Sequence, residues 1–330
     1  MKIFRDLDLA KETLGRSVLS VGNFDGVHLG HQAILKENIR LARTMDCASV
    51  VLTFEPHPQK VFRGGEAPPL LITLSQKLRI LQELGIAVTI ICPFDERIYN
   101  YSAEEFFAGI LKAKLGVAHL VEGEDFTFGK KGTGSPELLK KLGKEHGVGV
   151  TIVDPVVLDG ERISSSRIRT CIQGGDVLQA RSLLGRPYAV EGRKIRGKGR
   201  GRTLGYPTVN LRVENELLPA IGIYAVQVEL KERLFPGAAS LGFNPTFEGD
   251  DFSFEVYLLD LEGEVNSEPI SVLFHERLRD EIKFNSDREL IHQMEIDVGK
   301  VRSVFYKSDR AAEGPNPDDS SLPLRKTRPG

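Results

Sequence analysis

The sequence SVLSVGNFDGVHLGHQ, at residues 17–32, decides the fold of the first half of this chain. It begins with a short apolar run that ends at Gly22, as is typical of a buried parallel strand. Gly22 and Gly26 permit a tight turn, and residues 34–43 then follow a helical pattern. A strand that enters a helix through a glycine turn leaves backbone N–H groups and the positive end of the helix dipole free to bind phosphate.

Two histidines stand where this helix should start. His28 and His31 are three residues apart, so they share one face, and Gly30 between them lets a ligand approach the backbone. Two imidazoles at a phosphate-binding helix end suit a reaction in which negative charge builds up on phosphorus. Helix capping is the common alternative, and a zinc site would need a further ligand such as Asp25. The stretch lacks a Lys followed by Ser or Thr, so it is not a GxxxxGK[ST] phosphate loop.

The motif HxGH in this setting resembles the signature of the nucleotidyltransferase superfamily. The longer string GNFDGVHLGHQ resembles one branch of that superfamily, the prokaryotic riboflavin kinase/FAD synthetases. HxGH alone is weakly specific, whereas the whole string is strongly so.

Length and composition limit the class of protein. A chain of 330 residues has room for two domains, and 41% hydrophobic with 27% charged residues is typical of a soluble globular protein. The net charge of −2 argues against general affinity for nucleic acid or acidic membranes. The 3 cysteines suit a reducing compartment, and neither a signal peptide nor a membrane-spanning run is apparent. We therefore expect a cytoplasmic protein, a monomer or weak homo-oligomer, whose partners are small-molecule substrates.

Strand-like and helix-like patterns alternate from the first strand to about residue 155. Capping boxes at Thr73/Gln76 and Ser102/Glu105 begin two of the helices. This alternation predicts an α/β fold, a Rossmann-like doubly wound parallel sheet with helices on both faces. Ligands of such sheets bind beyond the carboxyl ends of the strands, where the strand order reverses. The further strands are expected at residues 48–54, 86–92, 117–121 and 148–153.

Two stretches that follow predicted strands should gather at this edge of the sheet. TFEPHP follows the second strand, and its prolines stiffen a loop in which Phe54 and His57 offer flat surfaces or hydrogen bonds. A rigid turn without function explains it equally well. GEDFTFG follows the fourth strand, and its Phe126 and Phe128 either hold a flat ring or belong to the core.

A third stretch, RISSSRIR at residues 162–169, follows the fifth strand. Three serines at a helix start supply hydroxyls and free N–H groups, and Arg167 and Arg169 add positive charge. An ordinary N-cap explains one serine but not three with flanking arginines. We therefore favour a second phosphate-binding segment.

All three stretches resemble the flavin-adenylylating module of the same family, with Ser166 where Thr is more usual. The resemblance implies that His28 and His31 are catalytic. It implies an ATP site made of Gly22, Asn23, Phe24, His28, His31, Arg162, Ser165, Ser166 and Arg169. It also implies a flavin and nucleotide pocket shaped by Phe54, His57, Pro58, Asp125, Phe126 and Phe128.

The pattern changes after a last short helix at residues 176–184. From 188 to 274 the segments alternate with period two between Gly, Pro and Asn turns, which predicts a small antiparallel β-barrel. We place the first domain at residues 1–185 and the barrel domain at 186–306.

The chain should end with a helix and a tail. Ser286 and Glu289 cap the helix, and residues 307–330, rich in Pro, Ser and charge, should form a disordered tail. The apolar face expected to pack on the barrel comprises Leu290, Met294, Val298, Val301 and Phe305.

The barrel half opens with RKIRGKGRGRTLGYP at residues 193–207. Its composition fits RNA binding, a flexible linker or a glycine-rich flap over a triphosphate. In the following PTVNL, Thr208 and Asn210 share one strand face, and their oxygens are of the kind that holds Mg²⁺ with phosphates. Glu255, in the alternating strand FSFEVYLL, is either a solvated residue or a general base.

The strings GKGRGRTLGYPTVNL, GIYAVQV, NPTF and LRDEIKF, with Glu255 in its strand, resemble the riboflavin kinase module. The resemblance implies that Thr208 and Asn210 hold the metal, Mg²⁺, and that Glu255 is the catalytic base. It implies that ATP and flavin contact Gly197, Gly199, Gly201, Thr208, Asn210 and Arg279. One departure is LEGEVNSEPIS at residues 261–271, where the family usually has a Leu-Tyr-Gly segment.

The resemblance as a whole implies a bifunctional enzyme of FAD biosynthesis. It would phosphorylate riboflavin to FMN with ATP, then adenylylate FMN with a second ATP to give FAD and pyrophosphate. The departure at 261–271 supports an alternative, an FMN adenylyltransferase whose barrel only binds flavin. A flavin- or nucleotide-sensing protein without turnover is a further alternative.

Overall fold

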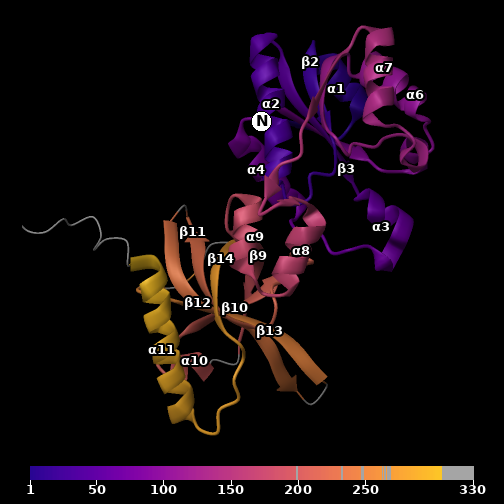
Figure 1. Ribbon diagram of the computed structural model, residues 1–330. Helices are drawn as coiled ribbons and strands as arrows, with labels where there is room; N and C mark the ends of the chain where they lie inside the picture. The colour runs from indigo at the N-terminus through magenta and orange to yellow at the C-terminus, as the bar shows by residue number, and fades with distance from the viewer. Residues whose placement is uncertain are drawn as a thin grey trace, which may run out of the picture.

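The computed structural model describes residues 1–197, 200–231, 233–246, 249–261, 263, 265 and 269–306. An α/β domain stands over a β-barrel, and α8 (Ser165–Gln173) and α9 (Val177–Leu184) lie at the junction (Figure 1). The predicted tail at 307–330, Gly199 and much of the LEGEVNSEPIS segment lie outside the described residues.

The first half forms one parallel sheet, as predicted. All five expected strands are present, with small shifts at their ends. A further edge strand was not expected because its three residues are too few to show a period. Strand order reverses between β2 (Ser17–Val21) and β5 (Val117–Gly123), so the predicted crevice opens beyond the end of β2. Across the sheet, the strands are β1 (Lys2–Phe4), β4 (Val88–Pro93), β3 (Ala48–Glu55), β2 (Ser17–Val21), β5 (Val117–Gly123) and β6 (Gly149–Val153).

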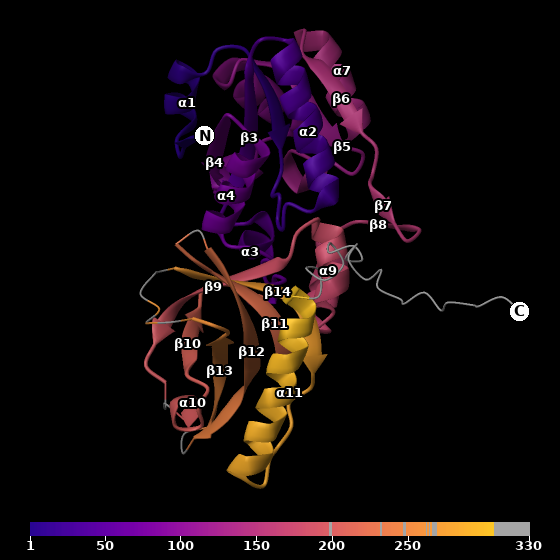
Figure 2. The ribbon, with the colours of Figure 1, turned by 90° about the vertical axis from the view of Figure 1, so that its left-hand side faces the viewer.

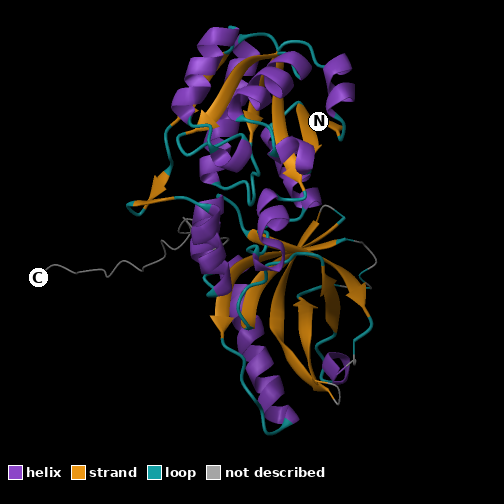
Figure 3. Ribbon diagram, turned by 90° about the vertical axis from the view of Figure 1, so that its right-hand side faces the viewer, coloured by secondary structure: helices purple, strands orange, loops and turns teal. Residues whose placement is uncertain are grey.

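Helices cover both faces of this sheet (Figure 3). Alternate residues explain this, because Leu19 and Val21 of β2 enter one apolar cluster and Val18 enters another. Both predicted capping boxes are confirmed. One face is covered by α1 (Leu7–Thr13), the π-helix η2 (Phe106–Lys114) and α7 (Pro136–His146), the other by α2 (Leu29–Thr44) and α4 (Leu74–Leu84).

The remaining elements of this half are short or lie near the junction. They are α3 (Pro58–Arg63), η1 (Gly64–Glu66), α5 (Glu96–Tyr99), α6 (Ala103–Glu105), η3 (Lys130–Gly132), β7 (Val157–Leu158), β8 (Glu161–Arg162), α8 (Ser165–Gln173) and α9 (Val177–Leu184).

The second half is a closed antiparallel barrel, as predicted. Its interior is filled by Tyr224, Phe254 and Phe274, which are nearly inaccessible to solvent. The strands, around the barrel, are β10 (Thr208–Val213), β13 (Gly249–Leu258), β12 (Arg233–Thr246), β11 (Gly222–Leu230), β14 (Ile270–Arg279) and β9 (Tyr188–Ile195).

The C-terminal helix α11 (Asp287–Tyr306) runs along the outside of the barrel (Figure 2). Its Val298, Val301 and Phe305 pack on the barrel surface, which confirms the predicted apolar face. Leu290 and Met294 instead line a cavity between the helix and the barrel. A short helix, α10 (Arg200–Thr203), lies at the end of the barrel remote from the sheet (Figures 1 and 2).

The two halves share apolar packing at the junction. One continuous cluster contains Leu81 of α4, Leu184 of α9 and Val190 of β9. The helix α9 precedes the barrel in the sequence but packs on the barrel strands β9 and β14. The division into two domains at residues 185 and 186 therefore stays a proposal.

Candidate active sites

The first candidate site is a cavity of about 650 Å³ at the carboxyl edge of the parallel sheet. The turn after β2, the loops after β3 and β5, and the start of α8 all contribute to its wall, as predicted. His28 and Arg162 do not line the cavity itself. The predicted residues that do are Gly22, Asn23, Phe24, His31, Phe54, His57, Pro58, Asp125, Phe126, Phe128, Ser165, Ser166 and Arg169.

His28 and His31 form a stacked pair at the start of α2, with ring centroids 3.7 Å apart. His28 is the N-cap, and its Nδ1 accepts a hydrogen bond from the backbone N–H of His31 at 3.3 Å. The capping alternative is therefore correct for His28, but it does not explain His31. Gly30 leaves room for the His28 ring, because a Cβ there would lie 3.1 Å from it.

Burial keeps both imidazoles neutral at pH 7. It lowers the pKa of His28 to about 4, where the positive charges of Arg162 and Arg186 act in the same direction. It also lowers the pKa of His31 well below the usual value for histidine. Neutral imidazoles here can donate or accept hydrogen bonds without adding charge before a ligand binds.

Two buried polar atoms of this cavity have no hydrogen-bond partner among the described residues. They are Nδ1 of His31 and Oδ1 of Asn23, and both residues line the cavity. A buried polar group without a partner costs about 1–3 kcal/mol, so such groups usually meet a ligand or water. These two atoms mark where a polar ligand would be held.

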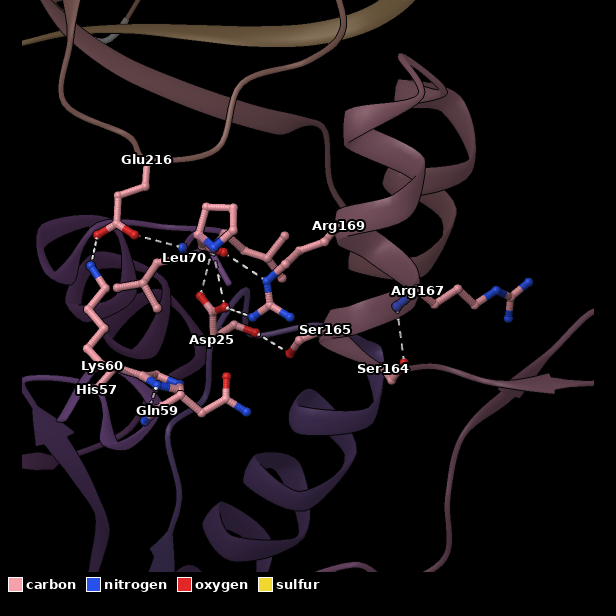
Figure 4. A network of polar contacts seen from close by, with 12 residues as sticks. Asp25, His57, Gln59, Lys60, Leu70, Ser164, Ser165, Arg167, Arg169 and Glu216 are labelled. Atoms are coloured by element: carbon pink, nitrogen blue, oxygen red, sulfur yellow. Dashed lines mark hydrogen bonds and ion pairs between the residues drawn. The ribbon is translucent and has the colours of Figure 1, made fainter. Parts of the chain in front are cut away.

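The start of α8 faces the same cavity (Figure 4). Ser164 is the N-cap and accepts from the backbone N–H of Arg167, while Ser165 donates its hydroxyl to the carbonyl of Asp25 at 2.9 Å. The side chain of Arg167 pairs with Glu161, away from the cavity.

Arg169 forms a buried ion pair with Asp25 at 2.6 Å. Asp25 is thereby held by α8 and takes no place beside the two histidines as a zinc ligand. No group of three or more metal-binding side chains occurs among the residues that the structure describes.

Aromatic side chains form another part of the cavity wall. Phe126 and Phe128 stack with ring centroids 5.4 Å apart, and Phe54 contacts Phe94 edge to face. At the rim, Asp125 pairs with Arg162 at 2.7 Å. The wall therefore offers flat apolar surfaces beside the polar turn.

The second candidate site is a cavity of about 530 Å³ between the barrel and α11. The predicted residues Gly201, Thr208, Glu255 and Arg279 line it, whereas Gly197 and Asn210 do not. Asn210 lies opposite Glu255 in the strand register.

Glu255 of β13 faces this second cavity. Its carboxylate accepts hydrogen bonds from Thr208 at 2.9 Å and from Ser253 at 3.2 Å. Arg279 is nearly buried and pairs with Asp297 of α11 at 2.7 Å. The sequence analysis expected α11 only to pack on the barrel, so it missed Asp297 as a residue of this second cavity.

Comparisons with known proteins match both halves. A family model described as FAD synthetase matches residues 10–167, and one described as riboflavin kinase matches residues 184–305. A Haemophilus influenzae protein named bifunctional riboflavin kinase/FMN adenylyltransferase is 37% identical over 306 residues, or 92% of this chain and 99% of its own. A Listeria monocytogenes protein of the same name is 38% identical over 88% of this chain and 93% of its own.

The chain belongs to the bifunctional riboflavin kinase/FMN adenylyltransferase family. A crystal structure described as a macrolide-efflux protein from Streptococcus pneumoniae also matches, with a TM-score of 0.83 and 32% identity over 92% of this chain and 99% of that one. Within the described part of this chain, no helix has both the length and the apolar character to span a membrane.

The structure of this family member adds two residues that the sequence analysis missed. Glu122 is almost fully buried in the first cavity, and its Oε1 accepts the backbone N–H of Val21 at 2.7 Å. Burial raises the pKa of Glu122 well above its usual value. The available signal was a carboxylate inside the largely apolar strand VAHLVEG.

Arg186 is the second missed residue, and it supports the turn before α2. Its guanidinium donates to the carbonyls of Val27 at 3.1 Å and Gly26 at 2.5 Å. Burial lowers the pKa of Arg186 to about 10. The turn needs support because Phe24 and Val27 adopt positive φ values of 47° and 40°, which are strained for residues with side chains.

Proposed function

We propose that this chain phosphorylates riboflavin to FMN in the barrel and adenylylates FMN to FAD at the edge of the sheet. The observation that carries the proposal is the pair of unpartnered atoms, His31 Nδ1 and Asn23 Oδ1, in a cavity beside two helix starts. Family membership supplies the two chemistries, since relatives that match nearly the whole chain bear both names. We further propose domains at 1–185 and 186–306, and a cytoplasmic monomer or weak homo-oligomer that binds no nucleic acid.

In the adenylyl step, a phosphate oxygen of FMN attacks the α-phosphorus of ATP. A new P–O bond forms, the bond to the bridging oxygen breaks, and pyrophosphate leaves. The protein supplies position and charge stabilisation rather than a covalent nucleophile. His28, His31 and the N–H groups that begin α2 and α8 would stabilise the charge that develops on the phosphate oxygens.

The remaining predicted residues of this site would hold the substrates. Ser165 and Ser166 would contact phosphate, with Arg162 and Arg169 adding positive charge. Gly22, Asn23 and Phe24 would lie along the nucleotide. The flat surfaces of Phe54, Phe126 and Phe128, with His57, Pro58 and Asp125, would shape the pocket for the rings.

In the kinase step, the ribityl 5′-hydroxyl of riboflavin attacks the γ-phosphorus of ATP, the bond to the β–γ bridging oxygen breaks, and ADP leaves. Glu255 would accept the hydroxyl proton, since its carboxylate faces the cavity and is held by Thr208 and Ser253. Gly197, Gly201 and Arg279 would contact ATP or flavin, and Gly199 stays a prediction on an undescribed residue.

The residues near Glu255 also suit the metal that the family implies. Thr208 and Asn210 offer a hydroxyl and an amide oxygen on neighbouring strand positions, which are hard ligands of the kind Mg²⁺ takes. When bound, Mg²⁺ would neutralise charge on the ATP phosphates.

The test is a product assay on the purified protein with Mg²⁺ and ATP, with riboflavin in one tube and FMN in another. We expect FMN and FAD from riboflavin, and FAD from FMN, resolved by chromatography. FAD from supplied FMN alone would overturn the kinase half. Absence of any new flavin in both tubes would overturn the whole proposal.

A further inference from the structure

Three consecutive residues of one loop are each held by a different part of the molecule. The carbonyl of Pro69 accepts from Nε of Arg169 on α8 at 2.8 Å. The backbone N–H of Leu71 donates to Asp25, in the turn after β2, at 3.0 Å. The N–H of Leu70, between them, donates to Glu216 of the barrel domain at 3.0 Å. The loop therefore links the first active site to the barrel (Figure 4).

Glu216 also contacts α3. One of its carboxylate oxygens accepts the hydrogen bond from the backbone N–H of Leu70, and the other forms an ion pair with Lys60 on α3. The helix α3 begins directly after His57, and His57, Pro58, Gln59 and Phe62 line the first cavity. One side chain of the barrel thus bridges both ends of the segment 60–70, whose start forms a wall of the adenylyl site.

The wall is only partly supported by apolar packing. None of the six residues of α3 is buried, and Phe62, whose ring contacts Phe94 and Tyr99 edge to face, is 61% exposed. A short exposed helix gains little stability from its own hydrogen bonds, so its position depends on the contacts at its ends. Glu216 supplies such contacts at Lys60 and Leu70.

We propose that Glu216 is a positioning residue for the adenylyl site. Through Glu216, the kinase barrel holds α3 in place as the wall of the cavity that binds FMN. The assignment of substrates rests on the proposed function. Glu216 does not line the cavity of the barrel, so its role concerns the adenylyl reaction alone. Both partners of the ion pair are about a third exposed, at 36% and 39%, which makes a moderate effect the expected one.

The test is steady-state kinetics of both reactions in the full-length Glu216→Ala and Glu216→Gln variants. For Glu216→Ala we expect the KM for FMN to rise about threefold to tenfold, with kcat within about twofold, because the wall is displaced but the reacting groups are not. The KM of Glu216→Gln for FMN should lie between those of the wild type and Glu216→Ala, since glutamine keeps an acceptor for the backbone N–H of Leu70. Riboflavin phosphorylation should be unchanged in both.

Two control variants separate positioning from general weakening. Glu214→Gln changes a carboxylate of the same loop that pairs with Arg193 at the surface of the barrel domain. Arg79→Gln removes a different contact across the junction, the ion pair with Glu191 at 2.6 Å. Both should keep the wild-type KM for FMN. Exchange of the charges in Lys60→Glu/Glu216→Lys should recover part of the loss seen in Glu216→Lys alone.

The outcomes are distinct. An unchanged KM for FMN in Glu216→Ala, with an active wild type, would overturn the positioning role and leave the proposed function intact. An equal rise in KM in Arg79→Gln would overturn it too, because the effect would then belong to any loosening of the junction. A wild type that makes no FAD from FMN would contradict the proposed function itself.

Discussion

The two cavities are built in opposite ways. The sheet cavity takes its polar groups from turns and helix starts, where His28 is buried and His31 half-buried, and both are neutral. The barrel cavity takes them from neighbouring strands, with Glu255 already hydrogen-bonded to Thr208 across the sheet. A turn that enters a helix concentrates chemistry in consecutive residues, whereas a strand pair divides it between distant segments that only the register joins. The first arrangement leaves a contiguous sequence signature, and the second leaves scattered residues.

Because the two cavities are separate, a substitution in one should lower one activity and leave the other intact. His28→Ala should lower FAD formation from FMN by about a hundredfold to a thousandfold, because one stabiliser of the developing phosphate charge is lost. FMN formation from riboflavin should stay within about twofold of wild type, because the barrel cavity has no contact with this turn. Chromatographic rates for both substrates check this. An equal loss of both activities would show that the cavities are coupled.

The matching variant in the barrel is Glu255→Gln. It keeps the shape of the side chain but cannot accept the proton of the attacking hydroxyl, so FMN formation should fall by about a hundredfold or more. FAD formation from supplied FMN should be retained. Full kinase activity in this variant would show that Glu255 is a solvated strand residue and not the general base.

A smaller effect is expected when the turn before α2 loses the support of Arg186. Arg186→Met removes the donors to Gly26 and Val27, and the strained turn should relax away from its active shape. We expect the kcat of FAD formation to fall about tenfold, with Arg186→Lys intermediate and the kinase unchanged. Wild-type kcat in Arg186→Met would mean that the turn holds its shape without the guanidinium.

The smallest effects concern acid stability, which the two halves should share. Burial lowers the pKa of His57 at the sheet cavity and of His275 under α11 to about 4. At these two histidines the folded protein therefore binds fewer protons than the unfolded chain between pH 4 and 6.5, and their contribution to stability is lost as the pH falls through this range. At pH 5.5 each histidine should cost about 1 kcal/mol relative to pH 7.5, once solvent screening is allowed for.

Urea unfolding at these two pH values checks that expectation. His57→Asn keeps an acceptor for the N–H of Gln59, and His275→Phe keeps the ring contact with Phe305. Each variant should lose about 1 kcal/mol less stability than wild type on acidification. The raised pKa values of Asp25 and Glu122 act in the opposite direction but are common to all three proteins. Identical losses in variant and wild type would contradict the burial argument.

The sequence predicted the sheet, the barrel and most of the lining of the first cavity, because periodicity and capping residues act locally. Glu122 and Arg186 were missed because their partners are backbone groups of another element, which no local pattern records. The ion pair between Asp25 and Arg169 was missed because its two side chains are 144 residues apart in the sequence and only the fold brings them together. Glu216 resembles any surface carboxylate until the fold brings it to Leu70.

The proposed function assigns two successive reactions to two separate sites in one chain, with FMN as the shared compound. The most direct test mixes the His28→Ala and Glu255→Gln proteins with riboflavin, ATP and Mg²⁺, and follows FAD over time. Neither variant alone should convert riboflavin to FAD, while the mixture should do so at a rate that rises with the concentration of either protein. A mixture that forms no more FAD than the two variants separately would contradict the account.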